Sequence, residues 1–313
     1  MDISYVVMTH KDPHQVRRLI SRLQHPQSYF YVHVDAAVPI EPFKEALQDL
    51  RNVHFIDNRV EVAWGSWRGV AMELKGIECA LIDGRSGFCM LISGQDYPIK
   101  HPDMLRATLE ANPDKLFINS VPMEELWDDY YIRVSHYNYG YREPNRFFLH
   151  FPSIFRRDFY RLRTLEHIGK LLLFKRELRV LGQIFIPRRF PSNFKAYGGS
   201  TWWALPLEFL KKLMKVHHEN PSFYAYQKYS LGPDEIYFQA LVTHLNGEKR
   251  LLNRLTYDNW EREGVQLPVS FSENSDLDLL LAQPEFIARK FEPDSPILDA
   301  LDEAIGFEPW TGN

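Results

Sequence analysis

The chain has 313 residues, of which 45% are hydrophobic and 25% are charged. This composition is typical of a soluble globular protein and excludes collagen-like, disordered and coiled-coil chains. The formal net charge of −4 gives no general attraction to nucleic acid, so we expect no nucleic-acid partner. The length allows one large domain or two small ones. Because no repeat, low-complexity tract or glycine-serine linker divides the sequence, we expect one domain over residues 1–313.

Two features of the sequence bear on where the protein works. It has only two cysteines, Cys79 and Cys89, which is typical of a reducing compartment, and both stand among apolar residues as inert hydrophobes. The opening segment MDISYVVMTH has no basic region before an apolar stretch and no cleavage site. No run approaches the ~18 apolar residues of a membrane span. We therefore expect a cytoplasmic protein.

The first third of the chain alternates short strands with helices. Apolar and β-branched runs predict strands at 3–8, 29–34, 53–56 and 88–92. Apolar residues at helical spacing predict helices at 13–23, 42–50 and 66–82. Such alternation predicts an α/β fold with a mainly parallel central sheet. Ligands of such sheets bind beyond the carboxyl ends of the strands, where Thr9, His10 and Asp35 are expected.

The segment at about 155–190 is strongly basic. Between Phe155 and Arg189, ten Lys and Arg residues and three acidic residues give a local charge of +7. Apolar residues between them predict a basic helical insertion, and a helical tail is expected at about 275–313. The insertion is either a solvated excursion or a surface for anionic lipid headgroups or an acidic acceptor, where each basic residue contributes about 1 kcal/mol. Its few aromatic residues disfavour nucleic-acid binding.

Several common ligand-binding motifs are absent from the sequence. It contains no phosphate-binding glycine loop, no zinc-type Cys/His spacing and no serine-nucleophile elbow. His10 and His33 stand in strand contexts, where packed or hydrogen-bonded histidines are commoner than metal ligands. The single Asp-x-Asp sequence, Asp276 to Asp278, opens a leucine-rich helix and is interpreted as a cap of that helix. These residues predict no metal site.

Four segments combine residue types suited to binding and catalysis. SGQDYPI (93–99) follows a strand at once, which places the Asp96 carboxylate near the carboxyl end of that strand. In GGSTWWAL (198–205), two glycines, which have no side chains, shortly precede two adjacent tryptophans. GPDE (232–235) precedes an apolar helix, and ARKF (288–291) stands before a terminal amphipathic helix.

Together with SYVVMTHKDP (4–13), YFYVHVD (29–35) and AWGSWRGVAMEL (63–74), these segments resemble the core-2/I-branching β-1,6-N-acetylglucosaminyltransferases and the peptide O-xylosyltransferases. The motifs follow the order of that family, and the resemblance covers nearly the whole chain. It implies a nucleotide-sugar-binding α/β domain of GT-A type with a UDP-sugar as donor. Eukaryotic members are luminal, membrane-anchored and disulfide-rich. Because this sequence shows none of these features, it is interpreted as a bacterial, cytoplasmic relative.

The resemblance assigns the chemistry of transfer to a few residues. Glu235 matches the general base of the family, which takes a proton from the acceptor hydroxyl. At the start of a helix its carboxylate is expected to stay ionised, with Asp234 as a cap or a partner.

The leaving diphosphate needs positive charge. Lys290 matches the diphosphate-binding lysine of the family, in which basic side chains replace the metal ion that most GT-A enzymes use. The second basic residue of the family is an arginine, but the matching stretch here reads LPV (267–269). Arg262 or Arg289 is the expected substitute. The resemblance thus implies no metal and no other cofactor.

Further contacts are expected for donor and acceptor. The donor is expected to contact His10, Asp35, Trp64, Asp96 and Ser200. The acceptor is expected to contact Arg133, Trp202, Trp203 and Trp260. For the tryptophans, stacking on sugar faces competes with packing in the core.

The sequence therefore predicts an inverting, metal-independent glycosyltransferase. It would move GlcNAc or xylose from UDP to a hydroxyl of a glycan or surface-polysaccharide precursor, in a β-linkage. The basic insertion would keep the enzyme beside a lipid-linked acceptor, peripherally at the inner face of the membrane. The alternative is a non-catalytic sugar- or nucleotide-binding protein that keeps the fold, which the missing arginine favours. GPDE and ARKF favour the enzyme, because a binding module needs no base.

Overall fold

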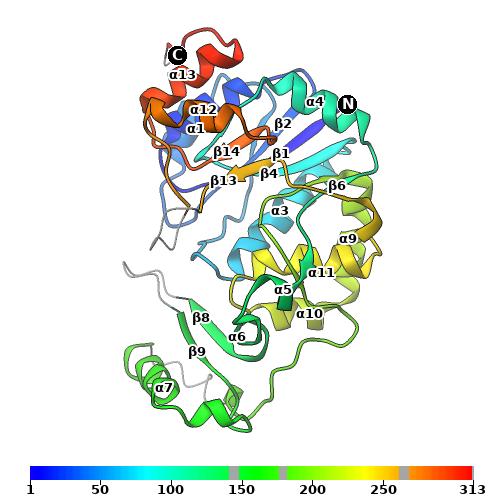
Figure 1. The fold of residues 1–313 in the computed structure, drawn as a ribbon, viewed down its shortest axis with the longest axis vertical. Coiled ribbons are helices and arrows are strands. Elements are labelled where there is room, and N and C mark those ends of the chain that lie inside the picture. The colour runs from blue at the N-terminus through cyan, green and yellow to red at the C-terminus, as the bar shows by residue number, and fades with distance from the viewer. Residues whose placement is uncertain (141–147, 176–181, 261–267, 312–313) are drawn as a thin grey trace.

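The computed structural model describes residues 1–140, 148–175, 182–260 and 268–311. Its centre is a seven-stranded sheet in the order β12-β6-β11-β4-β1-β2-β3 (Figure 1). Its strands are β1 (Ile3–Thr9), β2 (Ser28–Val34), β3 (Val53–Phe55), β4 (Phe88–Ser93), β6 (Leu116–Phe117), β11 (Ala204–Pro206) and β12 (Leu251–Leu252). Strands β4, β1, β2 and β3 are parallel, whereas β11 is antiparallel to both of its neighbours. The expected α/β class and mainly parallel sheet are confirmed.

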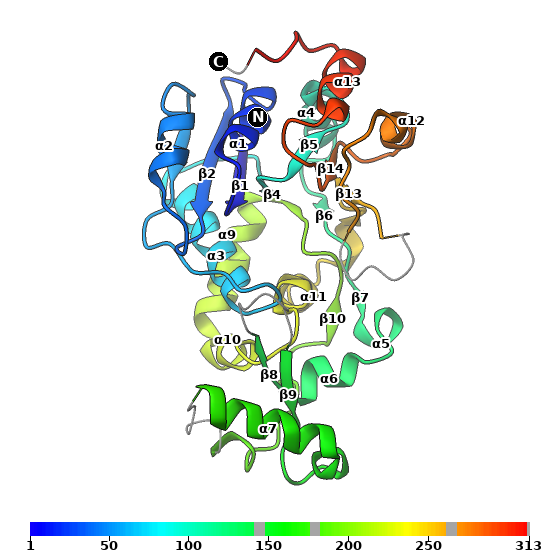
Figure 2. The ribbon, with the colours of Figure 1, turned by 90° about the vertical axis from the view of Figure 1, so that its left-hand side faces the viewer.

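Helices cover both faces of this sheet (Figures 1 and 2). One layer contains α1 (Pro13–Arg22), α2 (Glu41–Leu47) and α4 (Pro102–Ala111). The other layer contains α3 (Arg68–Ile82), α9 (Leu207–Glu219), α10 (Pro221–Gln227) and α11 (Tyr237–His244). Because side chains alternate along a strand, Tyr5 and Val7 of β1 pack in the first layer and Val6 in the second. Every strand and helix predicted for the first third is present, with bounds shifted by a few residues.

A small second sheet joins the C-terminal part of the chain to the centre. Its strands, in order, are β13 (Thr256–Asp258), β14 (Ile287–Arg289) and β5 (Asp96–Pro98). The helices beside it are α12 (Leu277–Leu281) and α13 (Pro296–Ile305). The expected helical tail therefore contains a strand, β14, between its two helices.

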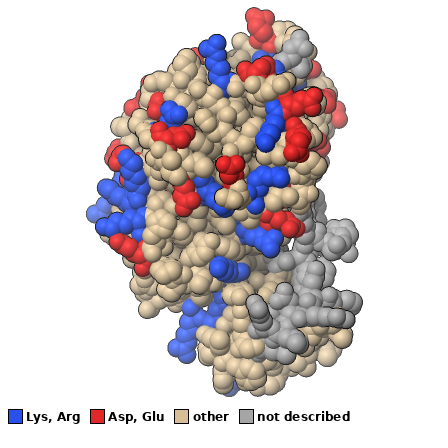
Figure 3. Space-filling view, turned by 180° about the vertical axis from the view of Figure 1, so that it is seen from behind, with Lys and Arg blue, Asp and Glu red and all other residues tan. Residues whose placement is uncertain are grey.

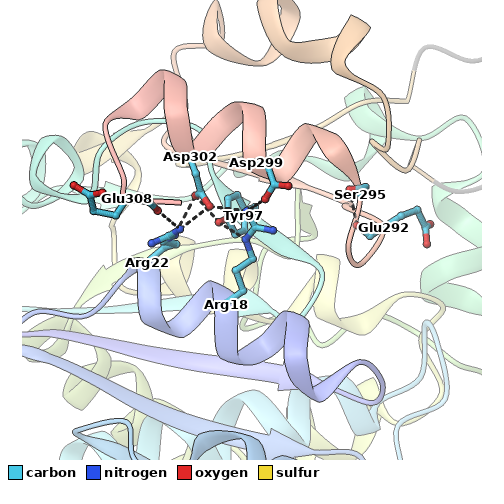
Figure 4. A network of polar contacts seen from close by, with 8 residues as sticks. All are labelled: Arg18, Arg22, Tyr97, Glu292, Ser295, Asp299, Asp302 and Glu308. Atoms are coloured by element: carbon cyan, nitrogen blue, oxygen red, sulfur yellow. Dashed lines mark hydrogen bonds and ion pairs between the residues drawn. The ribbon is translucent and has the colours of Figure 1, made fainter. Parts of the chain in front are cut away.

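A polar network fastens α13 to α1 (Figure 4). The Arg18 guanidinium donates hydrogen bonds to Asp299 and Asp302, each at 2.6 Å, and Arg22 donates to Asp302 at 2.7 Å. The Tyr97 hydroxyl also donates to Asp302, at 2.6 Å. Asp302 is buried, so it is the centre of the joint.

A lobe at the end of the molecule opposite α13 holds the described part of the basic segment (Figure 1). It consists of the hairpin β8 (Tyr137–Gly140) and β9 (Phe148–Phe151), a 3-10 turn (Arg157–Tyr160), and α7 (Leu162–Lys175). We call residues 137–140, 148–175 and 182–190 the basic lobe. Arg188 in this lobe is buried and donates hydrogen bonds to the carbonyls of Arg133 and Val134 in α6 (Tyr130–Ser135). Residues 176–181 of the expected insertion lie outside the described residues.

Three further observations complete the fold. Short strands β7 (Val121–Pro122) and β10 (Tyr197–Gly198) pair antiparallel beside α5 (Met123–Leu126). Cys79 and Cys89 are both free. Over the described ranges, no helix combines the length and the apolar character that crossing a membrane requires.

Candidate functional site

The carboxyl ends of three neighbouring parallel strands meet at one edge of the sheet. The Asp35 amide after β2 donates to the Thr9 carbonyl of β1, and the Gly94 amide after β4 donates to the Met8 carbonyl, both at 2.8 Å. His10 is exposed at this edge, next to Thr9. The edge predicted from the sequence is therefore formed by the strands expected to form it.

Asp35 organises a loop above this edge. One oxygen of its carboxylate accepts from the Ala37 amide at 2.8 Å and the other from the Val62 amide at 2.9 Å. The loop held in this way carries Trp64, whose side chain is 54% exposed. Contact with a nucleoside stays a prediction for His10, Asp35 and Trp64.

The GPDE segment is pinned between two other loops. Gly232 has a φ of 61°, a conformation that glycine adopts without strain, and its amide donates to the Gly65 carbonyl beside Trp64 at 3.1 Å. The Gly199 amide donates to the Glu235 carbonyl at 2.9 Å. Backbone hydrogen bonds therefore fix Glu235 relative to the Trp64 loop and the GGSTWW segment.

Two glycines permit this close packing. A Cβ at Gly199 would lie 1.9 Å from the Asn119 carbonyl oxygen, and one at Gly198 would lie 2.5 Å from the Trp127 ring. Neither position has room for a side chain. The fold therefore requires glycine at both positions, because the Asn119 carbonyl and the Trp127 ring lie too close for a side chain.

The Glu235 carboxyl group lies beside an arginine. Its Oε2 is 2.9 Å from Nη1 of Arg133, and the side chain of Glu235 is 33% exposed. Arg133 in turn lies over the Trp127 ring, 3.8 Å from its centroid. Arg133 is therefore held against Glu235 from behind, and the carboxyl group keeps access to solvent.

The pKa of Glu235 is raised to about 7, first by burial and then by Asp234, against the opposing effect of Arg133. The sequence predicted a carboxylate kept ionised at a helix start, and this is wrong. Glu235 ends a 3-10 turn (Pro233–Glu235) ahead of α11, where desolvation outweighs the helix dipole. At neutral pH the group is divided between its two protonation states, which suits a general base.

Two more carboxyl groups stand behind Glu235. Asp234 accepts from the Thr201 hydroxyl at 3.2 Å, and its other oxygen is buried with no hydrogen bond. Glu73 of α3 is completely buried and accepts from the Trp203 indole at 2.9 Å. Burial raises the pKa of both groups, and the pKa of Glu73 rises further because of Asp234. Asp234 lies inside the 3-10 turn and not at the N-cap of either helical element, which are Gly232 and Ile236, so of its two expected roles the structure supports that of a partner.

Arg254 was missed by the sequence reasoning. Its guanidinium donates to the Ser200 hydroxyl at 2.6 Å and to Oδ2 of Asp258 at 3.1 Å. In the sequence Arg254 and Asp258 are only an oppositely charged pair four residues apart, which is common on helix surfaces. The fold instead places the pair at β13, against the segment that follows Gly199.

Arg289 stands next to this pair. In the small sheet Asp258 of β13 is in register with Arg289 of β14. The Arg289 Nε donates to Asp96 at 3.2 Å, and its guanidinium carbon lies 4.0 Å from the centroid of the Trp202 ring. Arg289 is therefore a fixed cation, as expected of a substitute for the family arginine, and burial lowers its pKa.

Asp96 requires a correction. It was expected to bind sugar hydroxyls, but it is completely buried. One oxygen accepts from the Ser93 amide at 2.8 Å, and the other accepts from the Ser93 hydroxyl and from Arg289. Both oxygens are thus occupied, and Asp96 positions Arg289.

Lys290 directly follows Arg289 at the end of β14 and is partly buried. It follows a strand, so it is not the solvated lysine of a helix end. Its role at a diphosphate stays a prediction. Arg262 lies outside the described residues.

The tryptophans divide between core and surface. Trp203 is buried in the main core, so the prediction that it stacks on an acceptor sugar is wrong. Trp202 is also buried, and the Arg289 guanidinium lies over its ring in a cation–π contact. Trp260 is 51% exposed, so it retains a free surface for a ligand.

His33 and Asp276, which were considered as metal ligands in the sequence, have structural surroundings instead. His33 is buried, and its Nε2 accepts from the Val60 amide at 2.8 Å, as expected of a structural histidine. Asp276 immediately precedes α12, yet its side chain makes no capping hydrogen bond, so the cap interpretation is right in position only. Within the described parts of the chain, no three His, Cys, Asp or Glu side chains are grouped as metal ligands.

Comparisons with known proteins identify the relatives of this chain. Xylosyltransferase 2 of Mus musculus and that of Homo sapiens are each 26% identical over 96% of this chain. The Bos taurus beta-1,3-galactosyl-O-glycosyl-glycoprotein beta-1,6-N-acetylglucosaminyltransferase 3 is 28% identical over 47% of it. The chain spans about a third of the length of the two xylosyltransferases, 33% of each, and the match to the Bos taurus enzyme covers 33% of that protein.

Among solved structures, apo mouse xyloside xylosyltransferase 1 covers 95% of this chain and 100% of its own, with a TM-score of 0.38 and 10% identity. A model of the family described as Core-2/I-Branching enzyme matches residues 3–277. That range includes the strand edge, the Trp64 loop, the glycine pair, Glu235 and Arg254. The chain therefore belongs to the Core-2/I-Branching enzyme family.

Proposed function

We propose that this protein is an inverting glycosyltransferase of GT-A type that uses a UDP-sugar. The observation that carries the proposal is Glu235, a partly exposed carboxyl group whose pKa is about 7, fixed by backbone hydrogen bonds to the loops around the strand edge. A non-catalytic module has no need of a carboxyl group poised in this way.

In the proposed reaction, the acceptor hydroxyl oxygen attacks the anomeric carbon of the donor sugar as the bond from that carbon to the diphosphate oxygen breaks. The proton of the hydroxyl passes to Glu235, and the bonding electron pair leaves with UDP. Attack opposite the leaving group inverts the anomeric configuration and gives a β-linkage from an α-linked donor. We propose that Arg133, which pairs with Glu235, contacts the acceptor.

The departing diphosphate would be stabilised by cations. Arg289 is fixed by Asp96, Arg254 by Asp258, and Lys290 follows Arg289. Preorganised charges of this kind stabilise developing negative charge without reorganisation. We propose that they serve in place of a metal ion.

The donor sugar is proposed to be xylose or GlcNAc, because the relatives are named xylosyltransferase and N-acetylglucosaminyltransferase. The acceptor is proposed to be a glycan or lipid-linked saccharide. A cytoplasmic location is proposed from the two free cysteines and is open to cell fractionation.

The test uses Glu235→Gln, which keeps the shape of the side chain and removes the base. We expect transfer from UDP-xylose or UDP-GlcNAc to fall by about 10²–10⁴-fold, with the Kd for UDP by calorimetry changing less than threefold. EDTA should leave the UDP affinity of both proteins unchanged. UDP binding that requires Mn²⁺ would contradict the cationic clamp, and unchanged transfer in the variant would contradict the role of Glu235.

One observation favours the alternative, a binding protein that keeps the fold: Glu235 is paired with Arg133. UDP calorimetry together with the transfer assay distinguishes the two functions. A wild-type chain that binds UDP and never transfers sugar to any of a panel of saccharide acceptors supports the alternative.

A further inference from the structure

Helix α7 of the basic lobe presents an apolar side to solvent. Its buried residues, Thr164, His167 and Leu171, lie on one side of the helix, and α7 packs on β9. Leu162 and Leu173 are 84% and 78% exposed, and helical spacing places them on the opposite side. A surface helix normally turns its polar side outward, so this arrangement calls for a partner.

The exposed apolar surface continues beyond α7. Leu165 of the same helix is exposed, and so are the rings of Phe155 and Tyr160 in the segment that leads into it. Phe185 and Ile186, farther along the lobe, are exposed as well. Large apolar side chains gathered in one lobe mark an interaction site rather than scattered exposure.

Positive charge surrounds these side chains. Arg157, Arg161, Arg163 and Arg189 are all exposed in the same lobe. Its acidic residues are already engaged: Glu166 pairs with Lys170 at 2.5 Å, and Asp158 accepts from Arg156 at 3.0 Å. Seen from behind, the described surface of the basic lobe shows basic and uncharged side chains and no acidic ones, whereas acidic side chains are frequent on the rest of that face (Figure 3).

We propose that the basic lobe docks on the surface of an anionic lipid bilayer. The docking surface consists of Phe155, Tyr160, Leu162, Leu165 and Leu173 together with Arg157, Arg161 and Arg163. Leucine and aromatic side chains would enter the boundary between headgroups and acyl chains, and the arginines would pair with anionic headgroups. Because the whole chain carries −4, the rest of the surface is repelled by such a membrane, which fixes the orientation of docking.

The lobe is mechanically joined to the candidate site. Arg188 binds the carbonyls of Arg133 and Val134 at 3.2 and 2.6 Å, and Arg133 is the residue paired with Glu235. Docking would therefore hold the acceptor side of the site near the bilayer. The proposal goes beyond sugar transfer, and its test does not depend on that activity.

The experiment is co-sedimentation of the full chain with vesicles of phosphatidylcholine alone or mixed with phosphatidylglycerol. We expect the wild type to bind the mixed vesicles, to bind them less at high salt, and to leave pure phosphatidylcholine vesicles in the supernatant. Arg157→Glu/Arg161→Glu/Arg163→Glu should lower the partition coefficient at least about 100-fold. Leu162→Ser/Leu165→Ser/Leu173→Ser should lower it about tenfold or more.

Matched controls lie far from the lobe. Lys211→Glu/Lys212→Glu/Lys215→Glu on α9 changes the net charge by the same amount, and Ile82→Ser removes an apolar side chain that is as exposed as Leu162. Both should bind as the wild type does. Absence of wild-type binding, or equal losses in α7 variants and controls, would overturn the proposal. So would sedimentation velocity showing that the wild type is a dimer and the leucine variant a monomer, since a second copy would then cover this surface.

Discussion

Glu235 is held between neighbours that act on its proton in opposite directions. Asp234 disfavours the carboxylate, because two negative charges would stand side by side, while Arg133 favours it through a contact of 2.9 Å. Burial adds to the effect of Asp234. Asp258 raises the pKa as well, and the result is an acid with a pKa of about 7.

This balance predicts opposite shifts in two variants. The rate should rise with pH through about 7, because only the carboxylate accepts the acceptor proton. Asp234→Asn removes a repelling charge and should move that rise about one pH unit lower, whereas Arg133→Met removes an attracting charge and should move it about one unit higher. The measurement is kcat/KM against pH for each variant with one donor and acceptor pair. A rise that stays at the same pH in both variants would mean that another group accepts the proton.

How far a sequence reveals such a site is seen in individual residues. Glu235 was singled out because GPDE resembles a motif of the family, and its role as the base stays a prediction. The Gly198-Gly199 pair could be singled out in the sequence itself, because two adjacent glycines precede two tryptophans. Arg254 was not, because Ser200, to which it donates, lies 54 residues away in the sequence and is brought to it only by the fold. The burial of Asp96 and Trp203 was equally invisible, since it depends on what packs over a strand end.

At the scale of elements, the joint between α1 and α13 closes the molecule around the small sheet. Asp302 receives hydrogen bonds from Arg18, Arg22 and Tyr97, and its side chain is almost completely buried. Removing it would leave two arginines without their shared counter-charge. An uncompensated buried charge is among the costliest defects a fold can contain.

We therefore expect Asp302→Ala to lower the free energy of unfolding by about 3–5 kcal/mol. Asp299→Ala is the matched comparison, because Asp299 binds the same Arg18 but is 74% exposed; it should cost less than about 1 kcal/mol. Urea denaturation followed by tryptophan fluorescence measures both. Equal losses in the two variants would show that burial does not govern the strength of this joint.

The elements themselves were predictable where they were long. β1, β2, β4 and α3 follow clear hydrophobic patterns, and each lies where the sequence placed it. Strands β6, β11 and β12 have only two or three residues, too few to show a period. They become strands because the neighbouring edge of the sheet offers hydrogen bonds.

At the scale of the whole molecule, the basic lobe and the region around Glu235 are expected to respond oppositely to pH. Burial lowers the pKa of His136 and His150 to about 4. Asp158 opposes the shift at His136, and Arg156, Arg188 and His150 add to it. At His150, Asp129 opposes the shift, and His167 and Arg163 add to it. Both histidines bind protons more readily once unfolded, so the basic lobe loses stability as pH falls from about 6.5 to 4.

Around Glu235, the expected change of stability with pH has the opposite sign. The pKa of Glu235 is raised in the folded state, so Glu235 binds its proton more readily when the chain is folded, and its contribution to stability is lost as pH rises from about 4.5 to 7.

The two signs predict an uneven response to mild acid. Between pH 7 and pH 5, amide hydrogens of β8, β9 and α7 should open on the order of tenfold more often, while those of α11 should become no less protected. Hydrogen exchange with mass spectrometry, corrected for the intrinsic effect of pH, measures this directly. A uniform change over both regions would contradict the assignment of the histidines as the cause.

The position of β11 has a consequence for synthesis of the chain. This strand lies between β4 and β6, antiparallel to both, yet it is made long after them. The roughly 110 residues that separate β4 from β11 take about 5–20 s to translate. During that time a ribosome-bound chain carries an unpaired apolar edge along Phe88–Ser93, which no earlier segment of the seven-stranded sheet can cover. Nascent chains stalled before residue 204 should therefore be the form that chaperones must protect from aggregation.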